Sequence, residues 1–167
     1  LDQIEGESGQ NVHGSWRDMY KRIANLPASV FYFFLTLLGL PFSFRFIATR
    51  LVYAVIYSLV LYAVMRRLRS GKMIFAVVSL FPTMLFLAAN YSYDYWVNAF
   101  VMTGVAYLVG ALQRPEEKVT PREAALMIGA FVIGLGPKAI YFPMILLCLL
   151  VPKSSFVSAR QSRIFRA

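Results

Sequence analysis

One carboxylate stands alone in the middle of this sequence. Asp94 is the only acidic residue between Asp18 and Glu116, and it closes the polar run NYSYD over 90–94. An ionised carboxylate in an apolar segment is costly, so it usually faces a cavity or pairs with another charge. It can also be the N-cap of a helix that starts near Tyr95, where it satisfies free backbone N–H groups. The two interpretations are compatible, because a capping residue at a cavity rim can also contact a ligand.

Two cations are the other candidates for chemistry. Lys138 lies within the otherwise uncharged run 124–152, and Arg50 stands at the expected outer end of a helix. Either charge can contact phosphate on an anionic substrate, and a guanidinium can do so bidentately. Either can instead reach lipid headgroups along its aliphatic stem, so both interpretations stay open. Near these charges we expect four residues to line a cavity, namely Asn90, Ser92, Tyr93 and Tyr141.

The chain that carries these charges is far more apolar than a soluble domain. Of its 167 residues, 59% are hydrophobic and 15% are charged, with a mean hydropathy of +0.60. Soluble domains average about 45–50% apolar and about 25% charged residues, and disordered chains are more polar still. The composition therefore excludes a lone soluble domain and a disordered chain.

Composition also limits the possible ligands. One Cys and one His exclude a disulfide framework and a cysteine zinc cage, and we expect neither a metal nor a cofactor. The formal net charge is +9, but the basic residues lie between long uncharged runs instead of among polar and aromatic residues. Nucleic acid is therefore not an expected partner.

The long uncharged runs predict an all-α, polytopic membrane protein with about three full spans, over 49–65, 73–90 and 96–112. The run 124–152 is interrupted by Gly134, Gly136, Pro137 and Lys138, which predicts a hairpin of two short helices, each about 20 Å long. The run 23–44 contains Pro27 and Pro41 and predicts an outer interfacial or re-entrant helix. The alternative for it is an ordinary span with the N-terminal segment inside.

The distribution of positive charge predicts the orientation. Loops 66–72 and 113–123 and the tail hold eleven Lys and Arg against three acids, so all three should be cytoplasmic. Residues 91–95, rich in aromatics, should then be extracytoplasmic. The resulting division is the end of an extracytoplasmic loop (1–25), a transmembrane helical domain (26–152) and a basic cytoplasmic tail (153–167).

Four ordered segments match a known pattern. They are ASVFYFFLTLLG (28–39), TRLVYAVIY (49–57), FPTMLFLAANYSYDYWVNA (81–99) and GPKAIYFPMILLCLLVPKSSF (136–156). With them the chain resembles a bacterial integral membrane protein family, domain of unknown function 2142. That family is similar to the C-type membrane glycosyltransferases, which take sugars from polyprenyl-phosphate donors outside the membrane. In those enzymes an Arg tops an inward helix and an Asp ends a later hairpin, and Arg50 and Asp94 fall at comparable places.

The resemblance implies a fragment of a glycosyltransferase-like protein of cell-envelope assembly, with the bilayer, a polyprenyl-phosphate sugar and a glycan or glycolipid acceptor as partners. Arg50 and Lys138 would contact phosphate and Asp94 would shape the cavity. The catalytic acid of such enzymes follows their first transmembrane helix, so here it is unassigned and expected upstream of Leu1. Two alternatives remain: a transporter or flippase subunit for a lipid-linked or anionic solute, and a non-catalytic membrane partner.

Overall fold

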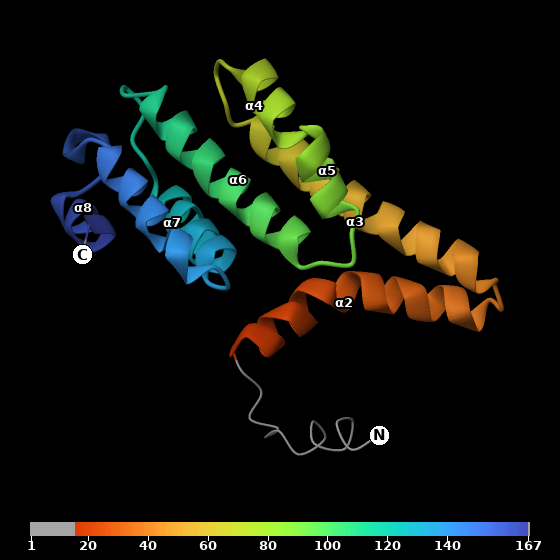
Figure 1. Cartoon of the computed structure of the whole chain (residues 1–167). Helices are drawn as coiled ribbons and strands as arrows, with labels where there is room; N and C mark the ends of the chain where they lie inside the picture. Colours follow the sequence, from red (N-terminus) through yellow and green to blue (C-terminus); the bar gives the residue numbers. More distant parts are fainter. Residues whose placement is uncertain (1–15, 167) are drawn as a thin grey trace.

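The computed structural model describes residues 16–166 and consists of helices joined by short loops (Figure 1). The elements are α2 (Trp16–Leu37), α3 (Phe42–Met65), α4 (Lys72–Ser79), α5 (Pro82–Ala88), α6 (Asp94–Leu112), α7 (Pro121–Leu135), the 3-10 helices η1 (Ala139–Leu150) and η2 (Lys153–Ser155), and α8 (Ala159–Arg166). The predicted all-α class is confirmed for this part of the chain. Of the predicted loop 1–25, residues 1–15 lie outside the described residues, and 16–25 form the first turns of α2.

Within residues 16–166, two helices are long and apolar enough to cross a membrane, namely α3 with 24 residues and α6 with 19. The helix predicted over 96–112 is confirmed as α6, which is a candidate span by its length and composition, whereas α3 begins at Phe42 and not at the predicted residue 49. Only 22% of the most apolar window of α3 is buried. A helix that is apolar on every side and mostly uncovered suits a lipid environment.

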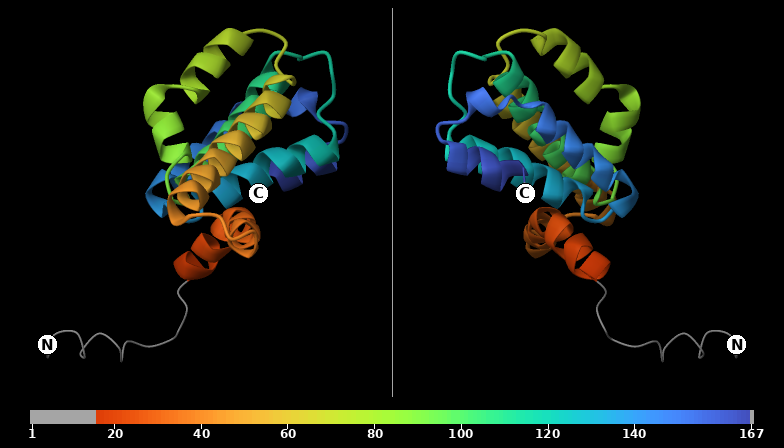
Figure 2. Two further views of the ribbon diagram at one scale, coloured as in Figure 1. Left: turned by 90° about the vertical axis from the view of Figure 1, so that its right-hand side faces the viewer. Right: turned by 90° about the vertical axis from the view of Figure 1, so that its left-hand side faces the viewer.

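The span predicted over 73–90 is divided into two short helices. Leu80 and Phe81 separate the eight residues of α4 from the seven of α5, and Pro82 takes the first position of α5. Proline lacks the N–H that a continuing helix needs and clashes with the preceding turn, so the first turn is the helical position that it favours. Three full spans are therefore not confirmed. The divided element arches beside α3 (Figure 2), where α4 contacts α3 and α5 contacts both α3 and α6.

The region 124–152 forms the predicted pair of short helices, α7 and η1. The chain breaks at 136–138, as the glycine and proline residues indicated. The second arm is a 3-10 helix, although the prediction was for ordinary helices. At about 1.5 Å per residue the 15 residues of α7 rise about 22 Å. At about 2.0 Å per residue the 12 residues of η1 rise about 24 Å.

Small residues bring α6 and α7 close together. A Cβ atom at Gly104 would lie 2.9 Å from the ring of Phe131, and one at Gly134 would lie 2.9 Å from Cγ2 of Val101. Such close backbone approach through glycine is typical of packed membrane helices. Gly134 therefore has the close-packing role that its place in an apolar helix suggests.

α2 and α3 form a hairpin, and α2 lies across the end of the α3–α6 pair (Figure 1). Gly39 makes the turn with a φ of 67°, a conformation that glycine adopts without strain. Arg45 then ties the two helices together, because its Nη1 donates to Thr36 Oγ1 at 2.8 Å and its guanidinium lies 5.2 Å from the centre of the Tyr32 ring. The helix predicted over 23–44 thus ends at Leu37, and its interfacial position stays a prediction.

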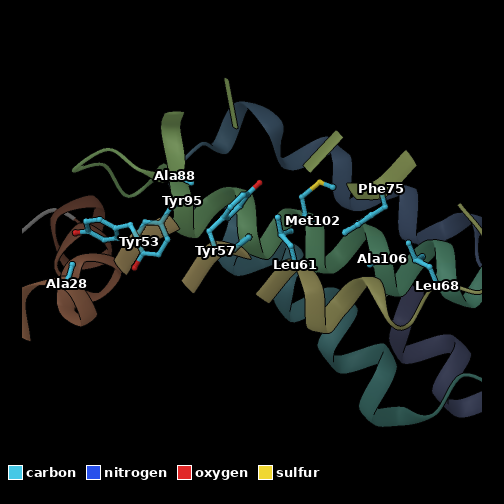
Figure 3. Close-up of a cluster of buried hydrophobic side chains, with 11 residues drawn as sticks. Ala28, Tyr53, Tyr57, Leu61, Leu68, Phe75, Ala88, Tyr95, Met102 and Ala106 are labelled. Atoms are coloured by element: carbon cyan, nitrogen blue, oxygen red, sulfur yellow. The ribbon is translucent and has the colours of Figure 1, made fainter. Parts of the chain in front are cut away.

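The main buried cluster lies between α3 and α6 (Figure 3). Thr49, Tyr53, Tyr57 and Leu61 recur every four residues on α3 and are all buried. They meet α6 residues such as Tyr95 and Met102, and the hydroxyl of Tyr57 donates to the carbonyl of Ser79 at 2.9 Å. The Tyr57 hydroxyl is thus satisfied by a backbone carbonyl, so its ring can fill an apolar core.

Candidate functional site

Asp94 and Lys138 form an ion pair, with Oδ1 and Nζ 2.7 Å apart. Asp94 opens α6, and Lys138 follows the break after α7 that Gly136 and Pro137 produce. The Asp94 side chain is 19% exposed and the Lys138 side chain 37% exposed, so the ion pair is partly buried. The expectation that the lone carboxylate pairs with another charge is therefore met, by the one cation of the run 124–152.

The carboxylate of Asp94 is not a helix cap. Tyr93 occupies the N-cap position of α6 and makes no capping bond with its side chain. Ser92 instead donates its hydroxyl to Asp94 Oδ2 at 2.8 Å and accepts from the backbone N–H of Asp94 at 3.2 Å. The predicted N-cap role for Asp94 is wrong, because the neighbouring hydroxyl satisfies the free N–H and the carboxylate turns towards Lys138.

Two predicted cavity residues flank this ion pair. The Tyr93 and Tyr141 side chains both lie close enough to Lys138 to interact with its charge. The ring of Tyr93 also meets Tyr20 of α2 edge to face, with the centroids 6.0 Å apart. We name Ser92, Tyr93, Asp94, Lys138 and Tyr141 the Asp94 cluster.

A further polar group near the cluster was missed from the sequence. Nδ2 of Asn98 is buried and has no hydrogen-bond partner in the described part of the chain. Asn98 lies one turn after Asp94, on the same face of α6. The spacing of four residues between two polar side chains in an apolar helix was the available signal.

Arg50 does not lie at a helix end. Because α3 begins at Phe42, Arg50 is in its third turn, and its Nε donates to the carbonyl of Ala89 at 2.7 Å. Ala89 is the C-cap of α5, where helix carbonyls lack intrahelical partners. Arg50 therefore holds the start of loop 89–93, and the end of the same loop belongs to the Asp94 cluster.

Asn90, the remaining predicted cavity residue, has a local role in the same loop. Its Oδ1 accepts from the backbone N–H of Tyr91 at 3.0 Å. This bond shapes the turn between α5 and α6, and it orients Tyr91 towards α3. The hydroxyl of Tyr91 donates to the carbonyl of Phe46 at 2.9 Å.

A cavity of about 510 Å³, which we name the α2–α3 groove, opens beside this loop. It is lined by Asn25, Ala28, Ser29, Tyr32, Phe42, Phe46, Thr49, Tyr53 and Tyr91. Tyr53 crosses it and donates its hydroxyl to Asn25 Oδ1 at 2.9 Å. Among the described residues, Arg50, Asp94 and Lys138 do not belong to its lining.

The groove was also missed from the sequence, although a signal existed. Asn25, Ser29 and Tyr32 recur at intervals of three and four, which places them on one face of α2. The facing residues of α3 follow the same spacing. A polar and aromatic stripe on each of two consecutive helices indicates a lined groove between them if the helices form a hairpin.

The arrangement favours binding over acid–base chemistry. Asp94 is neutralised by Lys138, and no carboxylate lines the groove in residues 16–166. Aromatic rings with a few amides and hydroxyls instead suit an organic ligand. Within the same described residues no three His, Cys, Asp or Glu side chains are grouped so that they could hold a metal.

The charged loops meet at the opposite end of the bundle. Arg67 pairs with Glu123 at 2.8 Å and Arg69 with Glu116 at 2.9 Å, which links loops 66–72 and 113–123. Gln113 adds to this link by accepting from the backbone N–H of Arg69 at 2.9 Å. The two loops predicted to share one membrane side thus lie together, and the side itself stays a prediction.

Glu123 combines this ion pair with a helix cap. It forms a capping box with Thr120, in which each side chain accepts from the backbone N–H of the other residue. Burial alone would raise the pKa of Glu123, but the bonds from Thr120 and the charge of Arg67 outweigh it and hold the pKa below the usual 4.5. Glu123 therefore stays ionised at the start of α7.

Comparison with known proteins agrees with the membrane character. A family model described as "Predicted membrane protein (DUF2142)" matches residues 22–166. The searches of curated proteins and of solved structures give no match.

Proposed function

The chain belongs to the DUF2142 family of predicted membrane proteins, and on that premise we propose that it is part of a multi-pass membrane protein that binds a polyprenyl-phosphate sugar. The process would be cell-envelope glycan assembly, by a protein related to the C-type glycosyltransferases. The observation that carries the proposal is the α2–α3 groove beside loop 89–93.

The groove has the composition that such a ligand needs. The rings of Tyr32, Tyr53 and Tyr91 offer flat faces for a sugar or an isoprenoid unit, and Asn25 and Ser29 offer hydrogen bonds to hydroxyl groups. Its volume of about 510 Å³ lies within the range of about 300–1,000 Å³ typical of small-molecule sites. The exposed apolar residues of α2 and α3 give a lipid tail a path from the bilayer to this groove.

The charges take supporting roles in this proposal. The Nε of Arg50 is engaged by Ala89, and no bond from its Nη groups is found among the described residues, so they can contact phosphate. The ammonium of Lys138 has three N–H donors and is 37% exposed, so it can contact phosphate while it stays paired with Asp94. Asp94 shapes the site. Sugar transfer needs a base for the acceptor hydroxyl, and this residue stays unassigned.

The function is tested with the full-length protein and a labelled polyprenyl-phosphate sugar. Label that appears in glycan supports the enzyme, and label that crosses the membrane without transfer supports the transporter or flippase. If neither occurs, the non-catalytic partner is favoured. The division of the 73–90 element into α4 and α5 is the observation that favours transport, since broken helices are common in transporters.

The role of the groove is tested by a matched pair of variants. Ser29→Trp places an indole inside the groove, while Val30→Trp places the same bulk on an exposed position outside its lining. We expect at least a tenfold loss of binding for Ser29→Trp and little change for Val30→Trp. Full binding by Ser29→Trp would overturn the assignment of the groove.

The phosphate contact of Lys138 is tested by a separate variant. Lys138→Met should still insert into the membrane but lose activity, and a fully active variant would contradict a contact between Lys138 and phosphate.

The predicted orientation has its own test. Cysteine at Ser92 should react with an impermeant thiol reagent in intact cells, whereas cysteine at Ser70 should not. The native Cys148 is buried and gives little background. Equal labelling at the two positions contradicts the orientation.

A further inference from the structure

The basic C-terminal segment is folded against the start of α7. The backbone N–H of Val119 donates to the carbonyl of Ser155 at 2.7 Å, and Gln161 Nε2 donates to the carbonyl of Val119 at 3.0 Å. The rings of Phe156 and Phe165 meet with their centroids 4.8 Å apart. These contacts fix α8 alongside α7, as both Figure 1 and Figure 2 show.

An apolar groove of about 370 Å³ lies between α7 and α8. Its lining, which defines the α7–α8 groove, is Pro121, Ala124, Ala125, Ile128, Ser158, Arg160, Gln161, Ile164 and Phe165. The floor is aliphatic, and the polar groups belong to the α8 side. The groove can therefore hold an apolar chain, and Arg160 places a positive charge at the edge of the groove.

The arginines of α8 lack carboxylate partners. The three acids at this end of the bundle are already engaged, Glu123 by Arg67, Glu116 by Arg69 and Glu117 by Arg114. No ion pair of Arg160 or Arg163 is found among residues 16–166. The positive charge of α8 is therefore available to an external anion.

The same face exposes apolar side chains beside these arginines. Ile164 is 68% exposed and Val157 is 61% exposed. Exposed apolar residues next to arginine are typical of helices that lie in the interface of a membrane. In a protein of a membrane family, this combination suits a surface that meets lipid headgroups and the adjoining acyl chains.

We propose that the α7–α8 groove binds one anionic phospholipid. The acyl chain lies along Ala125, Ile128 and Ile164, and the phosphate lies between Arg160 and Arg163, which are three residues apart and neighbours on the helix surface. Guanidinium groups bind phosphate bidentately, and basic sites at the ends of membrane helices bind anionic headgroups. The inference is independent of the sugar proposed for the α2–α3 groove.

The test uses the full chain in a neutral detergent, with bound lipid measured by native mass spectrometry. Dioleoyl-phosphatidylglycerol is compared with dioleoyl-phosphatidylcholine, which has the same acyl chains but a neutral headgroup. We expect at least a tenfold preference for phosphatidylglycerol. Arg160→Gln and Arg163→Gln should each weaken its binding about fivefold, the value expected for one basic residue at an anionic surface.

A matched control separates the groove from general charge. Arg66→Gln removes the same charge from an exposed position at the same end, outside the groove, and should change the affinity less than twofold. Ala125→Phe fills the exposed side of the groove and should abolish the preference with both arginines in place.

Several results would overturn the proposal. These are equal binding of the two lipids, an Arg66→Gln effect as large as that of Arg160→Gln, and an Ala125→Phe variant that keeps its preference. The last experiment is a competition with inorganic phosphate. If millimolar phosphate alone displaces the lipid, the site binds free phosphate and the phospholipid assignment fails. Phe165 and Gln161 hold α8 in place, so the arginine variants keep the fold against which these results are compared.

Discussion

Replacing Lys138 by Met tests how much the half-buried ion pair contributes to stability. The change removes the ammonium that lies 2.7 Å from Asp94 and leaves a carboxylate that is 19% exposed, with the Ser92 hydroxyl as its remaining partner. Breaking a fully buried pair costs about 3–5 kcal/mol, whereas an exposed pair contributes about 0–1 kcal/mol. The Lys138 side chain is 37% exposed and the Asp94 side chain 19%, so this pair lies between a buried and an exposed one. We therefore expect its loss to lower the free energy of unfolding by about 2 kcal/mol.

The assay is thermal unfolding of the purified protein in detergent. For a chain of this size, about 2 kcal/mol lowers the Tm by about 4–8 °C. In the double variant Asp94→Asn/Lys138→Met the isolated charge is gone, so most of this loss should be recovered. Lys72→Met, at an exposed and unpaired position of the described chain, is the control and should leave the Tm unchanged. A Lys138→Met protein as stable as wild type, or losses that simply add in the double variant, would refute the reasoning.

Three further predictions concern the packing and the loops. Gly104→Ala should destabilise the protein by about 1–3 kcal/mol in the same assay, because the new methyl group lies 2.9 Å from the Phe131 ring, while Gly129→Ala, which faces open space, should not. Gly39→Ala should cost about 1 kcal/mol through its φ of 67° alone, and an unchanged Tm would contradict that account. Glu123 has a lowered pKa in the folded state, so its stabilisation is present above pH 4.5 and is lost as the pH falls through the lowered value. Glu123→Gln should therefore flatten the acid side of a plot of Tm against pH, and two parallel curves would show that Glu123 does not contribute.

Part of this structure follows from local sequence features. The break at 136–138 is specified by Gly136 and Pro137 themselves, because each acts on its own backbone. α6 is likewise specified by a run of apolar residues that follows a polar loop. The pairing of Asp94 was predictable in kind, since an isolated carboxylate in an apolar chain needs a counter-charge.

The rest depends on contacts between distant segments. Hydropathy placed Arg50 at a helix end because a charge in an apolar run is costly, but the carbonyl of Ala89 satisfies it inside α3. That carbonyl is available only because Pro82 starts a short helix, α5, that ends at this point. Pro82 was visible in the sequence, but the residues on both sides of it are apolar. Hydropathy alone therefore predicted one continuous helix over 73–90.

The 3-10 winding of η1 sets how far its sequence reaches. The twelve residues of η1 extend about as far as the fifteen residues of α7, so the two helices have nearly the same length. Rewinding the same stretch as an ordinary α-helix would shorten it by about 6 Å. The far end of η1 is anchored by the segment 153–166, which packs against α7. Shortening η1 would therefore draw Lys138 away from Asp94, so the ion pair depends on the 3-10 winding of this helix.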